Sequence, residues 1–186
     1  MKVRPMTAAD TRCVMQIQSA CYGRELLEPE PVMLQRLQCS PQTCWVAGGQ
    51  GGVKGVAAYL FAYPSHVGRV TPLSGEFELL PEADTLYLHD LAVHPRLRGC
   101  GAAQKLVMQA FAFAVDQCLN YLALVAVQQA ASFWERHGFI MQPAQKAAPQ
   151  LASYGVRACY MVRELQGVSS VSDPQGCETG WDEIEV

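Results

Sequence analysis

Two arginines and two glycines gather where a largely apolar run gives way to a helical pattern. The stretch HPRLRGCG brings Arg96, Arg98, Gly99 and Gly101 directly behind residues 86–93. The N-terminus of a helix presents backbone N–H groups without partners, and glycine lets that backbone approach a ligand at positive φ. Arginine adds charge that pairs with phosphate oxygens. The pattern fits a phosphate-binding turn, and it fits equally well a helix entry that merely needs glycine.

This glycine pattern differs from two better-known nucleotide-binding motifs. It lacks the Gly-Lys-Ser/Thr ending of a Walker loop. It also lacks the third glycine of a dinucleotide fingerprint, and its strand comes late in the chain instead of opening a βαβ unit. Neither motif is therefore predicted.

The elements around the turn predict one mixed α/β domain over residues 1–165, a mostly antiparallel sheet flanked by helices. The clearest helical stripe runs from Ala103 to Cys118. The glycines of residues 48–52 predict a hairpin turn, Pro64–Asp84 predicts a long functional loop, and residues 166–186 predict an acidic, mobile tail. Strands are expected near residues 3–4, 43–48, 53–63, 85–93, 121–127, 139–142 and 158–165, and further helices near 14–21, 31–39 and 130–137.

Composition excludes several classes of partner. The chain has 186 residues, half of them apolar, and a formal net charge of −3. This balance gives no support for a nucleic-acid partner. No apolar stretch approaches the ~20 residues that span a bilayer, and no h-region of a signal peptide is present, so no membrane partner is expected. The eight cysteines form no CxxC pair, which predicts reduced thiols in a cytoplasmic protein and no metal site.

A family resemblance favours the phosphate-binding interpretation of the turn. Residues 96–101, RLRGCG, fit the Arg/Gln-x-x-Gly-x-Gly/Ala signature of the GCN5-related N-acetyltransferase (GNAT) superfamily. The flanking LHDLAVHP and ASFWERHGF resemble the family's strand before the signature and its later helix-Gly-Phe element. The order of elements resembles that fold over residues 1–165. The stretch LASYGVRACYMVREL is similar to the closing strand of a bacterial subgroup of unknown substrate.

The resemblance implies acetyl-CoA as cosubstrate. Its pyrophosphate would lie on the amides of Arg98–Ala102, and its pantetheine arm would follow the backbone of Leu91–Val93. In this family two strands separate to admit the thioester, here those of residues 85–93 and 121–127. The residues implied for acetyl-CoA binding are Leu91, Ala92, Val93, Arg96, Arg98, Gly99, Cys100, Gly101, Ala102, Phe133 and Trp134.

Acetyl transfer to an amine needs a group that takes a proton and a donor for the oxyanion. His89 and Asp90 are the candidate bases, and strand alternation puts them on opposite faces unless a bulge intervenes. His89 equally suits a satisfied strand histidine, and Asp90 a structural carboxylate that holds nearby backbone amides. The backbone N–H of Leu91 or Ala92 is the candidate oxyanion donor.

Two positions depart from the family pattern. Trp134 stands where many members have the tyrosine that protonates the leaving thiolate, and Val127 stands where they have an asparagine. Indole cannot act as an acid at neutral pH. Tyr154 or water could replace the tyrosine, a thiolate can also leave unaided, and Tyr154 also suits a plain turn residue before Gly155. Trp134 itself is expected in the core.

The break between the first two helices covers the acceptor site in this fold. Glu28 could bind an ammonium group there, and Tyr22 could pack on it. Solvent exposure is the simpler expectation for both side chains.

The predicted function is an N-acetyltransferase that moves an acetyl group from acetyl-CoA to a primary amine of a small molecule, by direct attack in a ternary complex. A non-catalytic acyl-CoA binder or sensor is the first alternative, because the usual tyrosine and asparagine are missing. A protein N-terminal or lysine acetyltransferase is the second. The oligomeric state stays open, with a homodimer allowed because dimers are frequent in the family.

Overall fold

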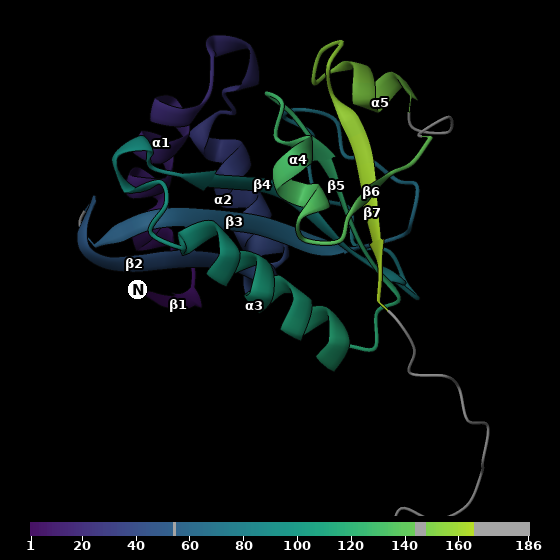
Figure 1. Ribbon diagram of the computed structural model, residues 1–186, viewed down its shortest axis with the longest axis horizontal. Coiled ribbons are helices and arrows are strands. Elements are labelled where there is room, and N and C mark those ends of the chain that lie inside the picture. Colours follow the sequence, from purple (N-terminus) through teal and green to yellow (C-terminus); the bar gives the residue numbers. More distant parts are fainter. Residues whose placement is uncertain (54, 144–147, 166–186) are drawn as a thin grey trace, which may run out of the picture.

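The computed structural model describes residues 1–53, 55–143 and 148–165 (Figure 1). The predicted tail, residues 166–186, lies outside the described part of the chain. None of the described helices is long and apolar enough to cross a membrane.

A seven-stranded sheet in the order β1-β2-β3-β4-β5-β7-β6 forms the centre of the protein. Neighbouring strands are antiparallel, apart from the parallel pair β4 and β5. The predicted mixed α/β fold with a mostly antiparallel sheet is confirmed. The strands are β1 (Lys2–Pro5), β2 (Cys44–Val53), β3 (Val56–Ser65), β4 (Thr85–Val93), β5 (Tyr121–Ala126), β6 (Ile140–Met141) and β7 (Cys159–Glu164).

Helices cover both faces of the sheet (Figure 1). On one face, called the α1/α2 face below, Ile17 and Met33 pack with Tyr59 and Tyr87 from the strands. On the opposite face, the α3/α4 face, Leu106 and Trp134 pack with Leu60 and Leu86. The helices are α1 (Thr11–Cys21), α2 (Glu30–Cys39), α3 (Ala102–Asp116), α4 (Ala131–Glu135) and α5 (Ala148–Ala152), with 3-10 turns at Ala8–Asp10, Arg24–Leu26, Pro41–Thr43 and Pro95–Leu97.

One local prediction needs correction, and one short helix was missed. The glycines of residues 48–52 do not form the hairpin turn, because β2 continues to Val53 and the turn comes at Gly55, whose φ of +84° suits glycine. The pairing of β2 with β3 absorbs the extra length through register shifts after Ala47. The short helix α5 was not predicted, since its five residues, APQLA, show no apolar periodicity and none of them is buried.

Candidate active site

The parallel strands β4 and β5 lie side by side for only part of their length. Thr85–Leu88 pair with Tyr121–Leu124. Beyond that point β4 stays paired with β3, while β5 stays paired with β7 as far as Ala126. The expected separation of these strands is confirmed, and it opens a gap in the middle of the sheet.

A bulge in β4 decides which side chains face this gap. Leu88 pairs with Ala62 and Asp90 pairs with the adjacent Phe61, so His89 is an extra residue without a partner. Strand residues ordinarily alternate between faces, and one extra residue breaks the alternation. His89 and Asp90 therefore both point toward the α1/α2 face. The sequence alone had left open whether β4 contains such a bulge.

Beyond the bulge, alternate residues of β4 turn their backbone groups toward β3 or away from it. The N–H of His94 donates to the carbonyl oxygen of Ala57 on β3. Backbone groups alternate in direction along a strand, so Ala92 also points toward β3. Leu91 and Val93 must then point toward the gap.

Contacts from the end of α1 agree with this direction. The hydroxyl group of Tyr22 lies 3.1 Å from the carbonyl oxygen of Leu91, and the thiol of Cys21 donates to the carbonyl oxygen of Val93 at 3.1 Å. In an antiparallel pair the N–H and C=O of one residue point the same way. Of the two candidate oxyanion donors, Leu91 rather than Ala92 presents its N–H to the gap.

The arginine–glycine turn joins β4 to α3. Gly99 and Gly101 both have φ of +79°, and an added Cβ would meet nothing within 4 Å, so conformation and not crowding calls for glycine. Gly101 is the N-cap residue of α3, and no side chain caps the helix. The first N–H groups of a 15-residue helix thus lack a side-chain acceptor at the positive end of its dipole. These features suit a bound anion such as a pyrophosphate.

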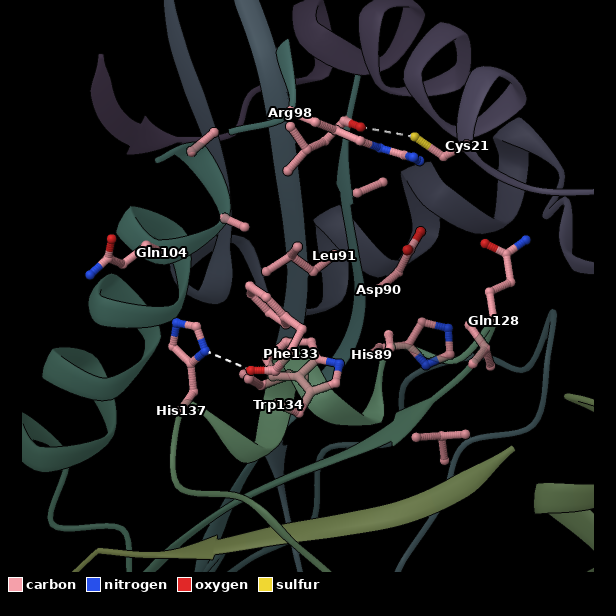
Figure 2. Close-up of a pocket in the computed structure, with 18 of the residues that line it drawn as sticks. Cys21, His89, Asp90, Leu91, Arg98, Gln104, Gln128, Phe133, Trp134 and His137 are labelled. Carbon is pink, nitrogen blue, oxygen red and sulfur yellow. Dashed lines mark hydrogen bonds between the residues drawn. The ribbon is translucent and has the colours of Figure 1, made fainter. Parts of the chain in front are cut away.

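A cavity of about 1170 Å³ extends from this turn through the gap to the α1/α2 face. In Figure 2, Gln104 and His137 lie on one side of Leu91, and His89 and Asp90 lie on the other. The residues predicted for CoA binding that line the cavity are Leu91, Ala92, Val93, Arg98, Gly99, Gly101, Ala102, Phe133 and Trp134. Arg96 and Cys100 are exposed and do not line it.

Trp134 is buried, as expected, and packs edge-on against Phe133 and Phe139. Val127, at the family's asparagine position, also lines the cavity. Within the described residues no three His, Cys, Asp or Glu side chains are grouped to hold a metal ion.

Asp90 places a carboxylate in the gap. Its Oδ1 accepts a hydrogen bond from the Tyr22 hydroxyl and its Oδ2 one from the Tyr59 hydroxyl, both at 2.7 Å. The expectation that Asp90 holds backbone amides is wrong, because the bulge turns its side chain toward these two tyrosines. Burial, reinforced by the charge of Glu28, raises the pKa of Asp90 to about 6. A carboxyl with such a pKa can take up and release a proton near neutral pH.

A buried ion pair lies behind His89. Arg36 donates two hydrogen bonds to the carboxylate of Glu28, at 2.6 and 2.7 Å, and the two side chains are 0% and 3% exposed. The expectation of an exposed Glu28 is therefore wrong, as is that of an exposed Tyr22, which is half-buried. Burial alone would raise the pKa of Glu28, but hydrogen bonds from His89 and Arg36 more than reverse this and keep the carboxyl ionised. Since Arg36 already matches that charge, Asp90 is the carboxylate left for a cation in the gap.

The surroundings of His89 favour its neutral form. Burial and the nearby charge of Arg36 lower its pKa. Its Nε2 lies 3.4 Å from both carboxylate oxygens of Glu28, so Nε2 carries the proton and donates it there. Its Nδ1 lies 3.4 Å from the Tyr154 hydroxyl, which itself donates to the carbonyl oxygen of Thr71 at 2.6 Å. Burial raises the pKa of Tyr154, so a role in protonating the thiolate stays a prediction that would require breaking the bond to Thr71.

Three contributors to the site were missed from the sequence: Tyr59, Arg36 and Leu73. Tyr59 is fully buried in β3 and looked like an ordinary core residue. Arg36 had a signal, because it falls in the buried stripe of α2 with Met33 and Leu37, where an unpaired charge would be costly. Leu73 lines the cavity from the long loop and had no signal, because periodicity says nothing about a loop.

Comparisons with known proteins agree with this geometry. Residues 12–139 match the sequence model of the acetyltransferase (GNAT) family. The chain belongs to this family. As a GNAT protein it is an acyl-CoA-dependent acyltransferase in its general class. The comparison with curated proteins found no match.

Solved structures show the same fold at low identity. A GNAT-like decarboxylase, GphF, in complex with isobutyryl-CoA matches with a TM-score of 0.72 and 15% identity, over 89% of this chain and 100% of that one. The loading GNATL domain of CurA from Lyngbya majuscula matches with a TM-score of 0.69 and 10% identity, over 88% and 96%. The NatC complex bound to Gag peptide and CoA matches with a TM-score of 0.64 and 17% identity, over 89% and 98%.

Replacing Gly101 with valine is expected to lower CoA affinity at least about tenfold, because a β-branched residue at positive φ distorts the turn that presents the helix amides. Gly68→Val is the matched control, since Gly68 has φ of +84°, open space around a Cβ and no place in the cavity lining. Both variants should lose a similar stability, about 1–2 kcal/mol. Titration calorimetry with CoA checks the difference, and equal CoA affinity in the two variants would contradict the assigned turn.

Replacing Arg36 with methionine is expected to lower stability by about 3–5 kcal/mol, because it leaves the carboxylate of Glu28 buried without a cation. Arg69→Met is the control: Arg69 pairs with Glu78 at 3.0 Å, but the side chains are 53% and 69% exposed, so its loss should change little. The melting temperatures of the two variants test this. Similar small shifts would mean that the buried pair contributes no more than the surface pair.

Proposed function

We propose that the protein transfers an acetyl group from acetyl-CoA to a primary amine of a small molecule, by direct attack in a ternary complex. The observation that carries this proposal is the continuous cavity, which joins the arginine–glycine turn on one side of the sheet to Asp90 on the other through the gap between β4 and β5. Bound acetyl-CoA would supply the thioester carbonyl that an amine attacks. The free N–H groups of α3 and of the β4 edge fit such a cosubstrate.

The chain's own residues suit the two proton and charge requirements of that reaction. Asp90 can hold an ammonium group in the gap and accept its proton, since its carboxylate has no cationic partner among the described side chains that hydrogen-bond to it. The N–H of Leu91 points into the same gap and can donate to a developing oxyanion. We assign the base to Asp90, whose carboxylate lies in the gap, and a positioning role to His89, whose proton-accepting nitrogen Nδ1 faces the Tyr154 hydroxyl.

The long loop, Pro64–Asp84, is held by several hydrogen bonds at the α1/α2 end of the cavity, and this favours a small acceptor. The N–H of Ser74 donates to Glu28, and Arg36 donates to the carbonyl oxygen of Gly75 from both Nε and Nη2. The N–H of Leu73 donates to the hydroxyl of Ser153, just after α5. A loop tied down from α2, the Glu28 segment and α5 leaves a covered compartment more than an open groove for a peptide.

Activity on a panel of small primary amines with acetyl-CoA tests the proposal. We expect acetylated amine and free CoA to form in equal amounts. Peptides with free N-termini and lysine-containing peptides belong in the same panel. Faster turnover of peptides would favour a protein acetyltransferase, and tight CoA binding without turnover of any amine would favour a non-catalytic binder.

The pH dependence should carry the signature of Asp90. Below a pH of about 6 its carboxyl is protonated and can neither hold an ammonium group nor accept a proton, so kcat/KM should fall as the pH drops through that value. Loss of a proton from the ammonium group gives the reactive neutral amine and adds a separate rise of kcat/KM at alkaline pH. In Asp90→Asn the rate should drop at least about a hundredfold and the limb near pH 6 should vanish.

The exposed Asp116 at the end of α3 provides the control for this profile, because Asp116→Asn removes a carboxyl far from the gap. Its pH profile should match that of the wild type. A limb near pH 6 that persists in Asp90→Asn would assign the base to another group.

A further inference from the structure

The part of the cavity on the α1/α2 face has an apolar and aromatic wall. Leu26, Leu73 and Val125 line it together with the rings of Tyr22 and Tyr154. The hydroxyl groups of both tyrosines are already engaged, that of Tyr22 by Asp90 and that of Tyr154 by the carbonyl oxygen of Thr71. What these side chains offer a ligand is hydrocarbon and ring surface. We call this part the acceptor compartment.

The acceptor compartment holds one carboxyl group, that of Asp90, without a cationic hydrogen-bond partner among the described residues. Glu28 and Arg36 neutralise each other in a buried, doubly hydrogen-bonded pair. Burial and the charge of Arg36 lower the pKa of His89, which favours its neutral form. Asp90 is left as a carboxylate whose hydrogen-bond partners, two tyrosine hydroxyls, carry no charge. A cation is favoured there and an anion is repelled.

Three arginines line the cavity, namely Arg98, Arg136 and Arg163. Arg163 donates to the carbonyl oxygen of His137 and its guanidinium stacks over Phe111 of α3, 4.5 Å from the ring centre. Arg136 directly follows α4 on the same α3/α4 face. Arg98 belongs to the turn, and Figure 2 shows it beside Cys21, with Asp90 between it and His89. Among the described hydrogen bonds, none of these arginines contacts Asp90, Glu28 or Tyr154.

We infer that the acceptor is a lipophilic primary amine without an anionic group, of the arylalkylamine or alkylamine class, whose ammonium is held at Asp90 and whose apolar part packs against Leu26, Leu73 and Tyr154. This inference rests on the proposed amine acetylation. Free amino acids are excluded as good acceptors, since their carboxylate would be buried next to Asp90 without a cation.

Three amines of one skeleton test the inference. Phenethylamine has only the ammonium and the ring, phenylalanine adds a carboxylate, and phenylalaninamide adds a neutral amide in its place. We expect phenylalanine to bind at least about a hundredfold more weakly than phenethylamine, because an unpaired charge is buried. Phenylalaninamide should bind about tenfold more weakly, because a polar but uncharged group meets an apolar wall.

The comparison is made with two measurements. Dissociation constants are measured by titration calorimetry on protein saturated with CoA and are referred to the protonated form of each amine. Values of kcat/KM are measured with acetyl-CoA. Because binding needs no turnover, the two measurements separate the inference from the proposed function.

A charge-introducing variant sharpens the test. Leu73→Arg puts a cation into the wall of the compartment and should shift the ratio of phenylalanine to phenethylamine affinity at least about tenfold toward phenylalanine. Leu73→Met keeps the volume and the apolar character and should leave the ratio as it is in the wild type.

Each outcome decides a different point. Preferential binding of phenethylamine without turnover would support the selectivity of the compartment and overturn the proposed acetylation. Turnover or binding of phenylalanine as good as that of phenethylamine would overturn the inference, with Arg98 then the partner of the carboxylate. Phenylalaninamide ahead of phenethylamine would overturn it in favour of a peptide N-terminus, and binding of none of the three would overturn it outright.

Discussion

One extra residue in β4, His89, has no partner on β3, and the geometry of the gap depends on this break in pairing. With regular alternation Asp90 would face α3 and Leu91 would face α1. The bulge moves the Asp90 carboxylate to the α1/α2 face and turns Leu91 toward the α3/α4 face. It thereby puts a carboxylate on one side of the gap and, one residue later, a backbone N–H donor at its edge. The same bulge comes directly after the last paired residues of β4 and β5, so strand separation and side-chain placement change at one point.

The buried pair of Glu28 and Arg36 connects segments that are distant in the sequence. A buried ion pair is poor evidence for stability, because removing two charges from water costs about as much as their attraction returns. Here each partner also makes backbone contacts: Arg36 donates to Gly75, and Glu28 accepts from Ser74. These contacts fix a loop that has no helix or strand of its own. The cation of the pair also lowers the pKa of His89, so the pair supports the compartment's electrostatics as well as its wall.

The sequence predicted the features that depend on neighbouring residues and missed those that depend on residues far apart in the chain. The apolar stripe of α3 and the strand pattern are local, and both elements formed where expected. The arginine–glycine turn was predictable through the family resemblance of residues 96–101, because its residue types alone fit a plain helix entry equally well. The burial of Glu28 was not predictable, because it depends on Arg36, which lies eight residues away in a different element. It also depends on the long loop, where Ser74 donates to Glu28 and Gly75 accepts from Arg36. The partners of Asp90 were equally inaccessible: Tyr22 and Tyr59 reach it over sequence separations of 68 and 31 residues.

A gap inside a sheet leaves backbone groups without the neighbouring strand that would normally pair with them, and such groups are costly when buried. Side chains at the end of α1 reduce that cost for the carbonyl oxygens. The thiol of Cys21 and the hydroxyl of Tyr22 contact the carbonyl oxygens of Val93 and Leu91, which are the acceptors along the free edge of β4. The N–H groups of the same residues receive no such side-chain partner among the described hydrogen bonds. The carbonyl oxygens of this edge thus have polar side-chain neighbours, while its N–H groups have none among the described hydrogen bonds. The N-terminus of α3, which no side chain caps, adds further free N–H groups. A ligand that pairs with both must be rich in acceptor oxygens along its length, which describes an amide-containing arm that ends in phosphates. In the proposed reaction, the donor-rich side of the gap would bind the cosubstrate and the compartment behind it the amine, and the two would meet at Asp90 and Leu91.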